Sequence, residues 1–177
     1  MRLLVSFALA VWPAAVLALD TERGAVTVSP VVTGLDAPWG VAQMPDGGLL
    51  VTERDGNLIH VASGSAQSVR GVPRVAAQGQ GGLLDITLAR DFATSRTLWL
   101  TYSKPQGRGS GTALAAAELS ADGRRLENVR DLFESAPGGS TGRHFGSRVV
   151  EARDGTLYVT IGDRGDRPSA QDRANHN

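Results

Sequence analysis

The sequence predicts an all-β protein of the β-propeller type, on the basis of its composition and an internal repeat. The chain of 177 residues has 22 glycines, 8 prolines and 5% aromatic residues, which favours many turns and short strands. One four-residue pattern recurs at Leu49–Thr52, Leu98–Thr101 and Leu157–Thr160, with offsets of 49 and 59 residues. Repeats of about 40 to 50 residues in a turn-rich β chain favour a propeller of four-stranded sheets over a sandwich or a closed barrel.

The first third of the chain divides into short apolar segments separated by turn residues. We expect strands at residues 27–33, 39–44, 48–53 and 57–62, with breaks rich in Gly, Pro and Asp between them. His60 lies in the last of these strands. We interpret it as a packed strand side chain rather than a ligand, because no second ligand candidate lies at a suitable spacing.

A glycine-rich stretch, Gln78–Asp85, has the superficial look of a phosphate-binding loop. Such a loop needs a helix after it, whereas residues 83–89 have the pattern of a strand. We therefore interpret the glycines as allowing close backbone approach, with the amide of Gln80 available to a ligand.

The second half of the chain is expected to alternate between loops and strands. Residues 104–112 and 136–142 are rich in Gly and Ser and are predicted to be loops. Residues 119–133 are predicted to hold a charged turn followed by a strand.

A histidine and an acid flank the last hairpin. Asp154-Gly155, between two alternating apolar runs, is a strong signal for a two-residue turn, which pairs Arg153 with Thr156. Counting outward from that turn places His144 diagonal to Asp163 on one face. A carboxylate on one ring nitrogen fixes the tautomer and raises the basicity of the other, as in a general base. The spacing also allows a purely structural hydrogen bond.

Charge and cysteine content narrow the possible partners. The formal net charge is zero and no basic stripe is present, which argues against nucleic acid and favours a neutral or small partner. The absence of cysteine excludes disulfides and thiolate metal sites. The acids Asp163, Asp166 and Asp172 lack the alternating spacing of a calcium loop, so we predict no metal ligand there.

The N-terminus has the pattern of a secretory signal peptide at residues 1–18. Arg2 precedes the apolar run Leu3–Leu17, and small residues precede the expected cleavage site. The run is shorter than the roughly 20 residues of a spanning helix, and Pro13 interrupts it. We expect a periplasmic or secreted mature domain of residues 19–177, with no membrane span after cleavage.

The repeat accounts for only about two to three blades. A propeller needs more blades to close and to protect its open edges. We therefore interpret the chain as the truncated N-terminal part of a longer protein.

Five short stretches, whose order and separations are more specific than any one alone, span nearly all of the mature chain. They are Leu35–Gly40, Gly79–Asp85, Arg90–Phe92, Thr141–Arg148, and Ile161–Asp163 with Gln171-Asp172 after it. In this order they resemble the soluble pyrroloquinoline-quinone (PQQ) dependent sugar dehydrogenases of the glucose/sorbosone dehydrogenase family, most closely the periplasmic aldose sugar dehydrogenases.

The resemblance implies a six-bladed propeller that oxidises an aldose at its anomeric carbon to a lactone, with hydride passing to PQQ. His144 matches the family's base, Asp163 the acid paired with it, and Gln80 a glutamine that lines the cofactor and substrate site. Arg143 stands where the family carries Asp or Asn, so we expect it to contact the substrate and to alter the sugar range.

The resemblance also implies PQQ and calcium as cofactors and a soluble electron acceptor as partner. It places the remaining quinone contacts and the calcium ligands beyond Asn177, so we expect the fragment alone to be inactive. Two other functions stay open from the residues: a propeller lactonase or metal-dependent hydrolase, and a noncatalytic propeller that binds proteins.

Overall fold

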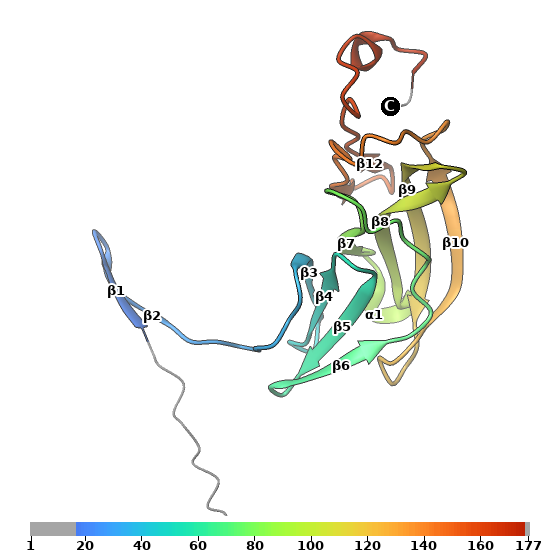
Figure 1. Ribbon diagram of the computed structural model, residues 1–177. Helices are drawn as coiled ribbons and strands as arrows, with labels where there is room; N and C mark the ends of the chain where they lie inside the picture. The colour runs from blue at the N-terminus through green and yellow to red at the C-terminus, as the bar shows by residue number, and fades with distance from the viewer. Residues whose placement is uncertain (1–16, 176–177) are drawn as a thin grey trace, which may run out of the picture. The chain divides into compact units, whose positions relative to one another are not determined.

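The computed structural model describes residues 17–175, which form antiparallel strands, one short helix and one 3-10 turn (Figure 1). The prediction of an all-β fold is confirmed. The expected leader at residues 1–18 lies almost entirely outside the described residues. Within the described part, no helix is long and apolar enough to cross a membrane. The chain divides into two compact units, residues 1–33 and 34–177.

The first unit contains an antiparallel hairpin of β1 (Leu17–Thr21) and β2 (Gly24–Val28). The strand expected at residues 27–33 is therefore wrong beyond Val28. Pro30 has no N–H to donate to a ladder, which disfavours continuation of β2 through it.

The second unit begins with a four-stranded antiparallel meander. Its strands are β3 (Pro38–Gln43), β4 (Leu49–Glu53), β5 (Asn57–Ala62) and β6 (Ser65–Val69). The first three were expected, whereas β6 was missed because four of its five residues are exposed and no apolar alternation marks it. It forms by folding back on β5 across Ser63-Gly64, whose φ angles of 50° and 75° suit a tight hairpin turn.

A second four-stranded meander follows, and it packs beside the first (Figure 1). It consists of β7 (Leu83–Leu88), β8 (Thr97–Gln106), β9 (Gly109–Leu119) and β10 (Leu126–Glu134). The one-turn helix α1 (Phe92–Ser95) connects β7 to β8.

The loop expected at residues 104–112 is wrong, because β8 and β9 occupy nearly all of it. The glycines that suggested a loop lie in a strand that another backbone approaches closely. A Cβ on Gly109 would lie 2.5 Å from the carbonyl oxygen of Gly139, and one on Gly111 would lie 2.1 Å from that of Ser135. Glycine is required there by close approach rather than by flexibility.

The last strands are β11 (Val149–Glu151) and β12 (Leu157–Val159), followed by the 3-10 turn η1 (Ser169–Gln171). We call β11 and β12 the ribbon. The register in which β11 pairs with β12 is shifted by one residue from the register that the sequence predicts.

The predicted pairing of Arg153 with Thr156 is wrong. The N–H of Ala152 donates to the carbonyl of Thr156 at 2.8 Å, so the loop has one residue more than expected. Asp154 accepts from the N–H of Thr156, and Gly155 adopts a φ of +85°. An Asp at the turn with Gly at the left-handed position is a three-residue hairpin loop rather than a two-residue one.

The three copies of the repeated tetrad lie at equivalent places, because each falls on the second strand of its sheet: β4, β8 or β12, with Thr160 directly after the end of β12. Their last residue explains the repeat. In the first sheet the fully buried hydroxyl of Thr52 accepts from the N–H of Gly40 at 2.8 Å. It also donates to the carbonyl of Leu84 in the second sheet at 2.6 Å.

Thr101 makes the same two bonds one repeat later. Its buried hydroxyl accepts from the N–H of Asp85 at 3.0 Å and donates to the carbonyl of Ser147, just before the ribbon, at 2.6 Å. We call each of these a threonine bridge. The Thr52 bridge joins the first sheet to β7, the first strand of the second sheet, and the Thr101 bridge joins the second sheet to the segment just before β11.

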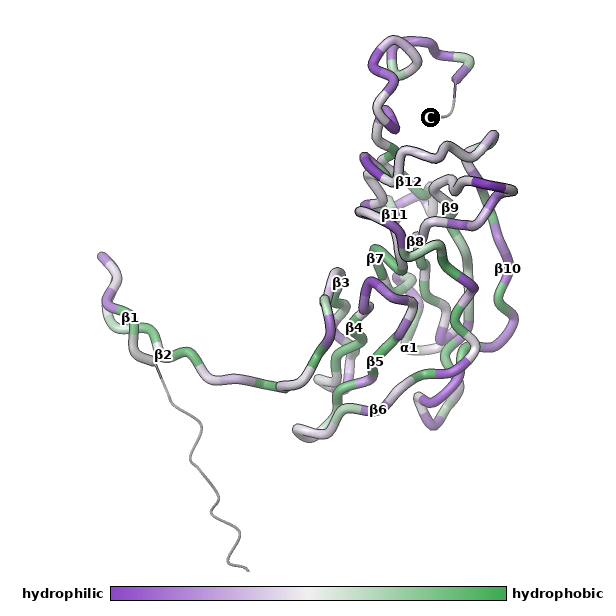
Figure 2. Tube along the Cα trace, in the orientation of Figure 1, coloured by the Kyte–Doolittle hydropathy of each residue, from purple (hydrophilic) through white to green (hydrophobic). Residues whose placement is uncertain are grey.

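The main core joins the two four-stranded sheets. Figure 2 shows hydrophobic residues along their strands and mainly hydrophilic residues in the segment after β12. The largest fully buried members of this core are Leu50, Leu58, Leu83, Leu98, Leu100 and Leu119.

Candidate active site around His144 and Asp163

The structure brings His144 and Asp163 into contact. Nδ1 of the imidazole lies 2.6 Å from Oδ1 of the carboxylate. The histidine side chain is 48% exposed and the aspartate side chain 21% exposed. The pair therefore combines a fixed partner on one ring nitrogen with a ring edge open to solvent.

The route to this contact differs from the expected strand geometry. The segment that carries His144 is irregular, with φ values of +63° at Gly142, +55° at His144 and +71° at Gly146. The two loops then meet at Gly162, where a Cβ would lie only 2.1 Å from the carbonyl oxygen of His144. The absence of a side chain at Gly162 is what lets Asp163 reach the imidazole.

The Asp163 carboxylate is held in its charged form. The N–H of Gly165 donates to it at 2.8 Å, and this bond, followed by the one to His144, lowers the pKa of Asp163 below its ordinary value. An ionised carboxylate only accepts, so the shared proton belongs on Nδ1 of His144. In the neutral imidazole Nε2 is then the nitrogen without a proton, which is the tautomer that a base at Nε2 requires.

Gln80 lies at the same site and fixes the histidine backbone. Its Oε1 accepts from the N–H of His144 at 2.8 Å, and its own N–H donates to the carbonyl of Gly142 at 2.8 Å. The interpretation of the neighbouring glycines as close-approach positions is confirmed, since a Cβ on Gly79 would lie 2.3 Å from that same carbonyl oxygen. The Gln80 side-chain nitrogen makes no hydrogen bond within residues 17–175 and is available as a donor.

Arg143 lies exposed beside the pair. Its guanidinium packs over Gly165, where a Cβ would lie 2.8 Å from Nη2. No carboxylate among the described residues forms an ion pair with it. The site therefore includes an exposed cation beside Gly165 that has no ion-pair partner among the described residues.

His60 is not part of this site. It lies in β5, and its ring packs against the turn that contains Gly123, where a Cβ would lie 2.5 Å from Nδ1. Its Nε2 is buried and has no hydrogen-bond partner among the described residues. The interpretation of His60 as a packed side chain is confirmed.

The sequence analysis did not identify two groups of residues that contact the loops of His144 and Asp163. Asp85 is buried and accepts from both Arg148 and the N–H of Val149. Phe145 and Arg164, each next in sequence to a member of the His144–Asp163 pair, stack on each other. Neither group was visible from spacing, because each joins residues that lie 19 or more positions apart in irregular segments.

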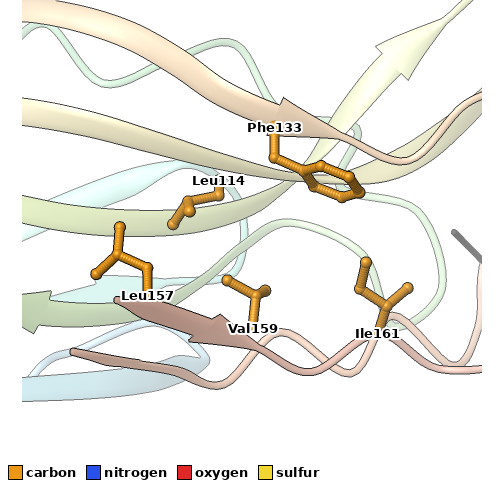
Figure 3. A pocket seen from close by; sticks show the side chains of 5 residues that line it. All are labelled: Leu114, Phe133, Leu157, Val159 and Ile161. Atoms are coloured by element: carbon orange, nitrogen blue, oxygen red, sulfur yellow. The ribbon is translucent and has the colours of Figure 1, made fainter. Parts of the chain in front are cut away.

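An apolar pocket lies between the second sheet and the ribbon (Figure 3). The side chains that face one another across it are Leu114, Phe133, Leu157, Val159 and Ile161. None of these five side chains is titratable, so the pocket offers no group for acid–base chemistry.

Comparison with known proteins shows which family the chain resembles. The profile of the Glucose / Sorbosone dehydrogenase family matches residues 35–177. The aldose sugar dehydrogenase YliI of Escherichia coli (strain K12) is 43% identical over 159 residues, which cover 88% of this chain and 43% of that protein.

Two solved structures have the same fold. The apo-form of the soluble aldose sugar dehydrogenase of Escherichia coli has a TM-score of 0.72 at 44% identity, covering 78% of this chain and 41% of that one. The PQQ-bound aldose sugar dehydrogenase of Streptomyces coelicolor has a TM-score of 0.75 at 27% identity, covering 92% and 47%. The chain thus spans less than half the length of these relatives. On the extent of these matches, the chain belongs to the glucose/sorbosone dehydrogenase family.

Proposed function

We propose that residues 19–177 form the N-terminal part of a six-bladed propeller that oxidises aldose sugars with PQQ. The observation that carries this proposal is the His144–Asp163 pair, with an ionised carboxylate on Nδ1 and an open ring edge at Nε2. The two four-stranded meanders and the ribbon support the proposal that the chain supplies two blades and the start of a third. The family and the PQQ-bound relative supply the cofactor class.

In the proposed reaction Nε2 of His144 takes the proton from the anomeric hydroxyl of the sugar. When bound, PQQ supplies the acceptor for the hydride that leaves the anomeric carbon, and the sugar becomes a lactone. Asp163 stabilises the imidazolium that forms, because its charge stays next to Nδ1 throughout. Gln80 keeps the ring in place through the His144 backbone.

The residues present fit one side of a quinone site. PQQ is a planar tricarboxylate, which calls for hydrogen-bond donors and cations. The side-chain nitrogen of Gln80 and the guanidinium of Arg143 would hold it or the sugar. Arg148 is less suited, because its guanidinium already binds Asp85 at 2.6 Å.

Calcium has no counterpart in the described residues. Within residues 17–175 no group of three or more His, Cys, Asp or Glu side chains could hold a metal ion.

The whole protein is the unit to which the activity is assigned. Because the chain spans less than half of its relatives, we expect the 177-residue chain alone to be inactive. We further propose that residues 1–18 are a signal peptide, that the enzyme works in the periplasm or outside the cell, and that it passes electrons to a soluble acceptor.

The test is dye reduction by the whole protein, loaded with PQQ and given an aldose. His144→Gln should lower kcat by about 10²- to 10⁴-fold with an unchanged circular dichroism spectrum. His60→Gln is the matched control and should retain turnover, since His60 packs in β5 away from the site. Full activity of His144→Gln would mean that His144 is not the base of the reaction. Activity that needs a divalent cation but no quinone would support a metal-dependent hydrolase instead.

A further inference from the structure

A second pair of side chains, Phe145 and Arg164, is adjacent in sequence to the His144–Asp163 pair. Phe145 and Arg164 each follow one of those two residues in sequence, and they are only 3% and 6% exposed. The guanidinium carbon of Arg164 lies 3.6 Å from the centre of the Phe145 ring, within the range of a strong cation–π contact. On each of the two loops, the exposed residue of the site is therefore followed directly by a buried one.

Arg164 is an unusual buried cation because no carboxylate pairs with it. Its Nη2 donates to the carbonyl of Ser110 at 3.1 Å, while Nε and Nη1 are buried without a partner among the described residues. Burial lowers the pKa of this guanidinium. Burying an unpaired charge is costly, so its position calls for a compensating contact, which the Phe145 ring supplies in part.

Strand β9 anchors both members of this buried pair. Thr112 donates through Oγ1 to the carbonyl of Phe145 at 2.8 Å, and two residues earlier Ser110 accepts from Arg164. The carbonyl of Arg164 accepts in turn from Oγ1 of Thr141, at the start of the loop that carries His144, at 2.8 Å. The two loops are therefore tied to one rigid strand and to each other.

We propose that Phe145 and Arg164 act as a buried clamp that sets the distance between His144 and Asp163. They are positioning residues for the base of the proposed dehydrogenase, and the inference rests on that proposed function. The clamp has an evident physical reason. His144 has a positive φ and a half-exposed ring, so its own packing does little to fix it, whereas its neighbour Phe145 is fully packed.

A competing role for Arg164 is electrostatic, as a positive charge near Asp163. The two roles separate in Phe145→Leu, which removes the ring but keeps every charge. They also separate in Arg164→Lys, which keeps the charge but loses the planar stack on the ring. A clamp requires both substitutions to disturb the pair, and a purely electrostatic role requires neither to do so.

The first measurement is the titration of the Asp163 carboxyl, followed by NMR in protein labelled with ¹³C-aspartate and assigned with Asp163→Asn. Its pKa is lowered by bonds from Gly165 and His144, so it reports directly on their geometry. In Phe145→Leu and in Arg164→Lys we expect the Asp163 midpoint to rise toward its ordinary value. An unchanged Asp163 midpoint in both variants would overturn the clamp. A third variant, Arg164→Met, removes the charge. If the Asp163 midpoint rose in Arg164→Met alone, Arg164 would act through its charge.

Phe92→Leu is the matched control. Phe92 is also 3% exposed and also lies under an arginine, Arg96, at 4.9 Å from the ring centre, but it belongs to α1 and not to the site. It should lower stability without moving the Asp163 midpoint. If Phe145→Leu does not fold, Arg164→Lys carries the same comparison.

Kinetics of the whole protein give the second readout. In PQQ-loaded enzyme, Phe145→Leu and Arg164→Lys should lower kcat by about 10- to 100-fold with little change in KM, since a misplaced base impairs the chemical step. Wild-type turnover in both variants would overturn the clamp while leaving the proposed function intact. Failure of the wild-type protein to oxidise any aldose would overturn the proposed function, while the NMR result would still decide whether the clamp exists.

Discussion

Asp85 and Arg148 form an ion pair at 2.6 Å in which the carboxylate is buried and the guanidinium is largely exposed. The carboxylate also accepts from the N–H of Val149 at 2.9 Å. One buried acid in β7 therefore receives two donors from the segment that leads into β11. This contact, together with the threonine bridge at Thr101, fixes the loop of His144 to the second sheet.

The first prediction concerns the stability of that attachment. Asp85→Ala should lower the free energy of unfolding by about 2 to 3 kcal/mol, because it removes two charge-assisted hydrogen bonds from a buried site. Asp55→Ala is the control, since Asp55 pairs with Arg54 where both side chains are about half exposed. It should change stability by less than about 1 kcal/mol. Urea denaturation measures both, and equal effects would contradict the proposed importance of Asp85.

The second prediction tests the threonine bridges. Thr101→Val leaves the buried carbonyl of Ser147 without its donor and should cost about 1 to 3 kcal/mol. Thr101→Ser keeps the hydroxyl and should retain most of the stability. Thermal or urea unfolding would show this order, and the interpretation would fail if valine were tolerated as well as serine.

The third prediction concerns the charge of Asp163 in the proposed enzyme. Asp163→Asn keeps a similar side-chain shape but removes the negative charge next to Nδ1 of His144, which would stabilise the imidazolium formed on proton removal. We therefore expect kcat to fall by about 10- to 100-fold, with little change in KM. The measurement is dye reduction by the PQQ-loaded whole protein. Wild-type kcat in Asp163→Asn would mean that the pair does not assist proton removal.

The fourth prediction concerns alkaline stability at the outer edge of the second sheet. Hydrogen bonds to Asp131 and then to Glu134 raise the pKa of Lys104 to about 12 from its ordinary value of 10.5. A folded pKa above the unfolded one gives stability that is complete below the unfolded value. That stability is lost as the pH rises from about 10.5 through about 12.

Lys104→Met should therefore flatten the fall of unfolding free energy in this window relative to wild type. Tyr102 contributes in the same direction, because burial and its bond to Asp131 raise its pKa as well. Urea titrations at about pH 9, 10.5 and 11.5, the first below and the last within the Lys104 window of about 10.5 to 12, measure the slope. An equal slope in Lys104→Met and wild type would refute this assignment.

Strands with apolar alternation between clear turns were predictable from the sequence. The strand β5 has the expected bounds, Asn57–Ala62, and β3, β4 and β7 differ by one residue at most at each end. β6 and much of β9 were not predictable, since a polar edge strand and a strand with glycines at Gly109 and Gly111 lack that pattern. In both cases the neighbouring backbone, and not local propensity, decides the structure.

The contact between His144 and Asp163 was predictable from the sequence, but the backbone geometry that produces it was not. The hairpin count brought His144 to Asp163 although the register was wrong by one residue and the histidine segment is not a strand. What places these residues is a set of tertiary contacts at Gly162, Phe145 and Arg164, which no periodicity in the sequence encodes.

The threonine bridges have a consequence for how such a chain can change over evolutionary time. Each hydroxyl recognises a backbone carbonyl, so the side chain at the receiving position is not specified: it is leucine at Leu84 and serine at Ser147. The attachment of one repeat to the next therefore does not depend on which side chain stands at the receiving position. The residues next to those positions differ between the repeats, with Asp85 after Leu84 and Arg148 after Ser147, although both repeats receive the same threonine bond. A charged or catalytic group can therefore stand beside a bridge on one repeat without changing the bridge itself.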